Sequence, residues 1–157
     1  MNKIKFAQRP SVEFVEEGNI LAPKFNAEDV IPVVVTETKS GLVLMLGYMN
    51  KEALEKTILT KEAHYWSRSR KALWKKGESS GMVHKIDEIL IDDDQDSIWL
   101  KVTIGGLGAS CHVGYKSCFY RSVDSIEKDE VILNFTESEK VFDPEEVYPG
   151  IENPTKL

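Results

Sequence analysis

The chain has 157 residues, 41% of them hydrophobic, a length that suits one domain with its own hydrophobic core. Its 20 basic and 26 acidic residues give a formal net charge of −6, which argues against a nucleic-acid-binding protein. No stretch reaches the roughly 18 apolar residues of a membrane span, and the first ten residues lack the apolar segment of a signal peptide, so we expect a cytoplasmic protein without membrane contact.

The sequence predicts a boundary between an N-terminal extension and the domain that follows it. Residues 1–27 contain proline and glycine breakers and are predicted to form an N-terminal extension, whereas residues 28–157 are predicted to form a single domain including its tail. Two runs rich in Val, Leu and Ile, at residues 31–36 and 42–48, flank a Lys-Ser-Gly turn signal. They predict a β-hairpin that opens the domain.

A helix is predicted directly after this hairpin. Asn50 is a suitable N-cap, and the helix is expected to start at Lys51 and to end near Lys61. Leu54 and Ile58 supply an apolar stripe on one face, as in a helix that covers a core.

The remaining chain is dominated by strand signals. Strands are predicted at residues 64–69, 83–91, 97–104 and 131–135, with a polar loop over residues 71–81. Repeated strands with one well-marked helix predict an α+β fold built on a largely antiparallel β-sheet with few helices.

An acidic run separates two of these strands. In an extended conformation Asp92, Asp94 and Asp96 would lie on one face, while Asp93 would point to the other. Three convergent carboxylates need a cation, and oxygen donors suit Mg²⁺. A solvated acidic turn is the alternative, whereas a calcium loop is excluded because the sixth position of the run is serine instead of glycine.

The two cysteines are the second candidate metal site. Two cysteines exclude a disulfide framework, although a single bridge stays open, and thiolates seven residues apart suit Zn²⁺. Cys111 and Cys118 could instead be buried core thiols, but the glycine-rich and polar sequence around them is typical of a site loop. His112 could ligate metal, transfer protons or satisfy a hydrogen bond.

A basic segment stands out in an otherwise acidic protein. Its arginines, lysines and serines could bind phosphate and its tryptophans could stack on a base, while a solvated loop with core tryptophans is the alternative. The candidate substrate-binding residues are Trp66, Arg68, Arg70, Lys75, Lys76, Ser79 and Ser80.

From about residue 31 to residue 121 the chain resembles phosphoribosyl-AMP cyclohydrolase, a family of histidine biosynthesis. The resemblance rests on four linked motifs, VLMLGYMN at 43–50, YWSRSR at 65–70, LWKKGESSG at 73–81, and CH at 111–112 continuing to SCFYR at 117–121. It implies opening of the adenine ring of phosphoribosyl-AMP at N1–C6, with zinc activating the attacking water and His112 transferring a proton.

The resemblance also implies the metal ligands and the assembly. It makes Asp92, Asp94 and Asp96 ligands of Mg²⁺ and Cys111 and Cys118 ligands of Zn²⁺, at the interface of an intertwined homodimer. The third zinc ligand is a cysteine of the partner subunit at the position where this chain has Asp93. Carboxylate oxygen also binds Zn²⁺, so a Cys₂Asp site is chemically reasonable.

Two further positions depart from the family pattern. His84 stands where glutamine is usual and Met82 where histidine or asparagine is common; His84 could replace a lost ligand or be an ordinary strand residue. Asp93 and His84 leave open a divergent paralogue that acts on another purine-like nucleotide, and a non-catalytic nucleotide- or metal-binding protein is a further alternative.

Overall fold

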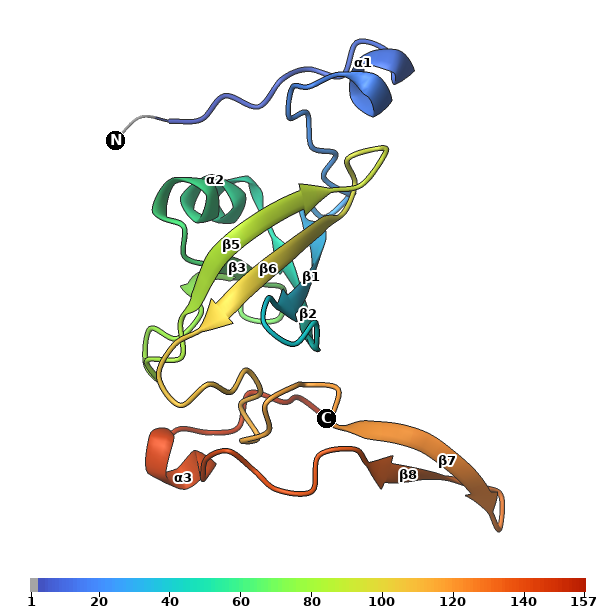
Figure 1. Cartoon of the computed structure of the whole chain (residues 1–157), viewed down its shortest axis with the longest axis vertical. Coiled ribbons are helices and arrows are strands. Elements are labelled where there is room, and N and C mark those ends of the chain that lie inside the picture. The colour runs from blue at the N-terminus through green and yellow to red at the C-terminus, as the bar shows by residue number, and fades with distance from the viewer. Residues whose placement is uncertain (1–2) are drawn as a thin grey trace.

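A four-stranded sheet forms the centre of the protein in a computed structural model, which describes residues 3–157 (Figure 1). Its strands are, in spatial order, β2 (Val43–Met49), β1 (Ile31–Glu37), β6 (Ile98–Ile104) and β5 (His84–Ile91). β1 pairs antiparallel with β2 and parallel with β6, and β6 pairs antiparallel with β5. The predicted α+β class with largely antiparallel pairing is confirmed.

The predicted helix is α2 (Lys51–Thr60), which begins and ends where the sequence indicated. The Asn50 side chain accepts a hydrogen bond from the Ala53 N–H at 2.9 Å, which satisfies one of the free donors of the first turn. Lys61 then adopts a left-handed φ of 59° and ends the helix.

A short hairpin of β3 (His64–Ser67) and β4 (Ala72–Lys75) packs beside α2 and β2. The prediction of a polar loop over residues 71–81 is therefore wrong in its first part. Trp74 of β4 lies 5.1 Å from Tyr65 between ring centroids, and Leu73 and Trp74 pack against the core, so this short strand is partly buried.

The core lies between the sheet, α2 and β3. Ile31, Val33 and Val35 of β1 are fully buried, because alternate side chains of a strand point to the same face. Leu54 of α2 and Leu100 of β6 belong to the same buried cluster. This core fixes the ends of the strands, and the loops described below start from those ends.

The N-terminal segment is anchored on the turn between β5 and β6, beside α1 (Val12–Glu17) (Figure 1). The buried Gln95 side chain accepts a hydrogen bond from the Ala22 N–H at 2.7 Å and donates one to the Val15 carbonyl at 2.9 Å. The Gln95 carbonyl accepts a third bond, from the Lys24 N–H at 2.7 Å. Residues 15–24 are thus tied to the acidic turn.

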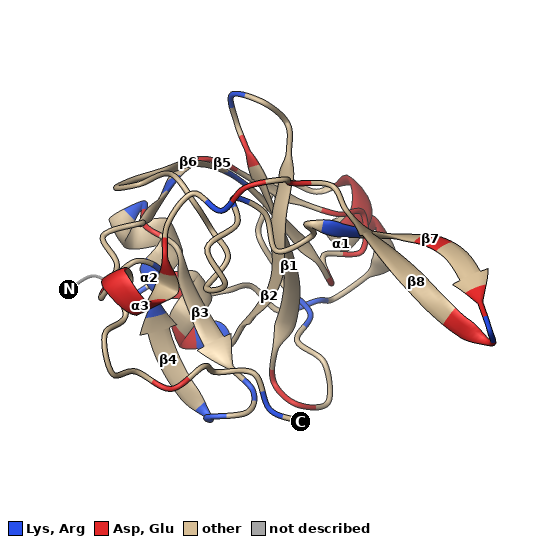
Figure 2. Cartoon of the chain, turned by 90° about the horizontal axis from the view of Figure 1, so that it is seen from below, with Lys and Arg blue, Asp and Glu red and all other residues tan. Residues whose placement is uncertain are grey.

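The C-terminal part contains a second hairpin, β7 (Arg121–Glu127) and β8 (Glu130–Phe135), which projects from the body with acidic residues near its tip (Figure 2). The predicted strand at residues 131–135 is confirmed, but β7 was not predicted because its many polar residues give a weak strand pattern. Five of the hairpin's apolar side chains are exposed, namely Val123, Ile126, Val131, Leu133 and Phe135.

After this hairpin, α3 (Pro144–Val147) and the last residues turn back toward the β3–β4 side of the molecule. Within residues 3–157, no helix has the length and apolar character that crossing a bilayer would require.

Candidate active site

A cavity of about 1440 Å³ opens between the β3–β4 hairpin, the end of β2, the loop that carries the cysteines and the C-terminal segment. The fold brings all seven candidate substrate-binding residues to its wall, together with His112 and Cys118. The residues are Trp66, Arg68, Arg70, Lys75, Lys76, Ser79 and Ser80.

The two arginines lie on the turn between β3 and β4. The Arg68 guanidinium stacks on the Tyr48 ring at 3.8 Å from its centroid, and Arg70 donates to the Ser67 hydroxyl at 3.3 Å. Stacking on an aromatic face leaves the edge of a guanidinium free to bind an anion. The arrangement suits a phosphorylated ligand.

The two serines follow a tight turn at Gly77. Gly77 has a φ of +83°, and a Cβ atom there would lie 2.3 Å from the Val83 nitrogen, so only glycine fits. This close approach folds the loop back toward β5 and presents Ser79 and Ser80 to the cavity.

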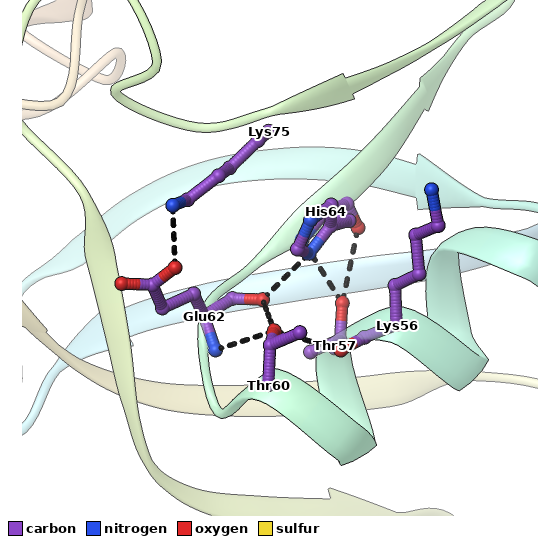
Figure 3. A network of polar contacts seen from close by, with 6 residues as sticks. All are labelled: Lys56, Thr57, Thr60, Glu62, His64 and Lys75. Carbon is purple, nitrogen blue, oxygen red and sulfur yellow. Dashed lines mark hydrogen bonds and ion pairs between the residues drawn. The ribbon is translucent and has the colours of Figure 1, made fainter. Parts of the chain in front are cut away.

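The two lysines have different surroundings. Lys75 forms an ion pair with Glu62, within a polar network that joins the end of α2 to β3 and β4 (Figure 3). Lys76 reaches inward and donates to the Ser110 carbonyl at 2.6 Å. Burial lowers the pKa of Lys76, whereas the nearby thiols of Cys111 and Cys118 act to raise it.

Cys111 and Cys118 are both free cysteines, and their thiols interact. Interaction with Cys118 lowers the pKa of Cys111 to about 6, and the same interaction raises the pKa of Cys118. A thiol with a lowered pKa next to a second free thiol suits a pair that binds a borderline metal ion. Zinc binding itself stays a prediction.

His112 lies at the cavity wall beside the C-terminal segment. Its Nε2 is 3.5 Å from the Thr155 hydroxyl. Burial lowers the pKa of His112, although a hydrogen bond with Asn153 acts in the opposite direction. The imidazole is thus neutral near pH 7 and able to accept a proton.

His84 does not line the cavity and instead lies fully buried behind it. Its Nδ1 is 3.0 Å from the Tyr65 hydroxyl and its Nε2 is 3.2 Å from the Ser110 hydroxyl. Both ring nitrogens are engaged, which supports a hydrogen-bonded strand residue over a replacement metal ligand. Met82 is buried nearby against Ala109 and Phe142.

The aspartate triad is assembled by a turn, not by an extended strand as predicted. Residues 92–96 connect β5 to β6, and Gln95 has a left-handed φ of 57°. Carboxylate oxygens of Asp92, Asp94 and Asp96 nevertheless lie within 4.8 Å of one another. Three carboxylates at this spacing could hold a metal ion.

Hydrogen bonds within the turn shift the pKa values of Asp92 and Asp96 in opposite directions. Burial acts to raise the pKa of Asp92, but bonds from Ser97 and Asp96 lower it overall. Asp96 shares hydrogen bonds with Asp92 and Asp94, which raises its pKa to about 6. Crowding by the other two carboxylates therefore disfavours the charged form of Asp96, and a divalent cation at the triad would relieve it.

Asp93 is exposed on this turn and is far from the two cysteines. β6 separates the turn from the cysteine loop (Figure 1), and seven strand residues span roughly 20 Å. Within residues 3–157 the aspartate triad is the only group of three or more metal-ligating side chains. One chain does not bring Asp93 to the thiols.

Sequence reasoning missed several residues around the cavity. Glu62 engages Lys75, Tyr48 supports Arg68, and Asn153 contacts His112. Tyr48 belongs to the motif VLMLGYMN, so the sequence did point to its ring as a possible part of the site. Neither Glu62 nor Asn153 belongs to any motif, and only the fold shows their contacts.

Comparisons with known proteins identify relatives over most of the chain. The family model described as phosphoribosyl-AMP cyclohydrolase matches residues 45–120. A protein of that name from Rhodopseudomonas palustris (strain HaA2) is 51% identical over 142 residues, which cover 90% of this chain and 95% of the relative. Another, from Nitrobacter winogradskyi, is 50% identical over 133 residues, covering 85% and 90% respectively.

Proposed function

Because this chain belongs to the phosphoribosyl-AMP cyclohydrolase family, we propose that its cavity is where water opens the adenine ring of phosphoribosyl-AMP between N1 and C6, a step of histidine biosynthesis. One observation carries the assignment of the site. A single cavity collects the basic and serine side chains of residues 66–80 together with His112 and Cys118, which are distant in sequence.

The substrate's phosphate is assigned to Arg68, Arg70, Ser79 and Ser80. Guanidinium and hydroxyl donors bind phosphate oxygens well, and neither arginine is engaged in an ion pair with a carboxylate among the described residues. Lys75 is a weaker candidate because Glu62 holds its ammonium group. Trp66 offers an aromatic face for the purine.

The two donor sets fit two different ions. Asp92, Asp94 and Asp96 would hold Mg²⁺, because crowded carboxylates with one raised pKa gain from a hard cation. Cys111 and Cys118 would hold Zn²⁺, because paired thiols suit a borderline ion. Zinc bound there would supply the Lewis acid that activates the attacking water.

His112 is assigned the proton transfer. As a neutral imidazole it would accept a proton from the attacking water as the new C6–O bond forms. It would return that proton to N1 as the N1–C6 bond breaks. The contacts of His112 with Asn153 and Thr155 orient the ring at the cavity wall.

A steady-state assay that follows the absorbance change on ring opening tests this function. The full-length protein with Zn²⁺ and Mg²⁺ should turn over phosphoribosyl-AMP, and His112→Gln should lower kcat by about 10²–10⁴-fold. Exposed Asn19→Gln is the matched control and should keep wild-type turnover. Absence of turnover under every metal condition would overturn the proposal.

We also propose that two copies form an intertwined homodimer, with Asp93 of each copy completing the zinc site of the other. Asp93 and the thiols of one chain lie at opposite ends of β6, so only a second chain could join them. The exposed apolar side chains of the β7–β8 hairpin give a second copy a surface to cover, since isolated hairpins are marginally stable in water.

Light scattering tests the assembly, because one chain weighs 17.8 kDa and a dimer about twice that. A monomer mass at micromolar concentration would contradict it. We place the protein in the cytoplasm, since its cysteines are free thiols as a reducing compartment requires.

A further inference from the structure

The two cysteines of the site lie in one loop, and each side of that loop is also held by a different part of the fold. The Cys118 N–H donates to the Leu44 carbonyl at 2.7 Å, and the Ser117 hydroxyl donates to the Val43 carbonyl at 2.7 Å. Cys118 is thus fixed to β2. Cys111 donates its N–H to the Tyr115 carbonyl at 3.1 Å within the same loop, and it follows Ser110, whose side chain and carbonyl are held by β5 and by the loop after β4.

His84 is the residue of β5 that contacts Ser110. Its Nε2 is 3.2 Å from the Ser110 hydroxyl, and both residues are almost completely buried. The Tyr65 hydroxyl is 3.0 Å from Nδ1 on the other side of the ring. A neutral imidazole has one donor and one acceptor nitrogen, so these two bonds use both and fix the ring's orientation.

The backbone of His84 belongs to the same support. Its carbonyl accepts the Ala63 N–H at 2.9 Å, and the Ala63 carbonyl accepts the Lys76 N–H at 3.0 Å. The Lys76 ammonium group in turn donates a hydrogen bond to the Ser110 carbonyl. Ser110 is therefore held at three atoms: its N–H donates to the Lys116 carbonyl at 2.8 Å, and the contacts of its hydroxyl and its carbonyl both lead back to His84.

We propose that His84 is a positioning residue of the thiol pair. Through its bond to the Ser110 hydroxyl it holds the main chain that carries Cys111 at a fixed place relative to Cys118. It acts through Ser110 and does not touch the substrate. The identity of the bound ion rests on the proposed function, whereas the contacts that connect His84 to Cys111 do not.

Pulsed alkylation of the full-length protein, read residue by residue by peptide mass spectrometry, tests this role without any turnover. Buried Cys111 should react slowly in the wild type. Ser110→Ala and His84→Phe each remove the bond, and each should speed labelling of Cys111 about tenfold, the effect of losing about one buried hydrogen bond. His84→Gln should restore slow labelling, because its amide offers both a donor and an acceptor.

Tyr65→Phe is the matched control. It removes a hydrogen bond from the same imidazole but leaves the Ser110 contact, so Cys111 labelling should stay near the wild-type rate. Wild-type labelling in Ser110→Ala would overturn the proposal, as would equal acceleration in Tyr65→Phe, which would indicate general loosening. Failure of the wild type to retain Zn²⁺ would overturn the proposed zinc site and leave this result intact.

Discussion

Replacing Gln95 with alanine is expected to lower the free energy of unfolding by about 2–4 kcal/mol. Losing the 2.9 Å bond to the Val15 carbonyl removes about 1 kcal/mol. The Ala22 N–H, fully buried and bonded to Gln95 at 2.7 Å, would lose its acceptor, which costs about 1–3 kcal/mol more. The backbone bond from Lys24 remains in the variant.

Urea denaturation followed by fluorescence of the tryptophans measures this change. Gln8→Ala is the matched control, because it makes the same substitution at an exposed glutamine of the same N-terminal segment. The control should change stability by less than about 0.5 kcal/mol. If Gln95→Ala were equally mild, the Gln95 contacts would not anchor the segment and the reasoning would be refuted.

Three further predictions concern the site. Asp93→Cys should slow zinc loss to a chelator, because thiolate is a softer donor than carboxylate, and unchanged retention would show that Asp93 is not a ligand. Arg68→Lys keeps the charge but loses the planar stack on Tyr48, so KM should rise about tenfold with kcat nearly constant; an unchanged KM would contradict the assigned phosphate contact. Burial lowers the pKa of His84 to about 3. Between about pH 6.5 and pH 3 the unfolded chain therefore binds a proton at His84 that the folded chain does not bind. The free energy of unfolding should fall on acidification through this range by up to about 1.4 kcal/mol per pH unit. His84→Gln should flatten that slope in denaturation curves, and equal slopes would contradict it.

Short sequence patterns predicted the helix α2, whose ends are set by residues close to it in the sequence. The cap at Asn50 and the apolar residues after it sufficed for α2. The strand at Ala72–Lys75 escaped prediction because its stability comes from pairing with β3 and from Trp74 packing on Tyr65, which no short pattern reveals.

The acidic run shows a correct grouping reached through an incorrect geometry. Strand alternation and a tight turn both bring Asp92, Asp94 and Asp96 together, so the triad was foreseeable while its backbone was not. The turn depends on Gln95, which adopts the left-handed φ of the turn and whose buried amide binds the N-terminal segment. The only sign of this turn in the sequence is the uncharged Gln95 inside a run of aspartates.

The parallel pairing of β1 with β6 has a consequence for synthesis of the chain. Val33 of β1 pairs with Ile98, so one edge of β1 stays unpaired until the ribosome has released the residues of β6. During that interval the run Ile31–Glu37, rich in valine, is a free strand edge of the kind that associates with other chains. The unpaired edge of β1 is therefore open to pairing with other chains until the residues of β6 have emerged from the ribosome.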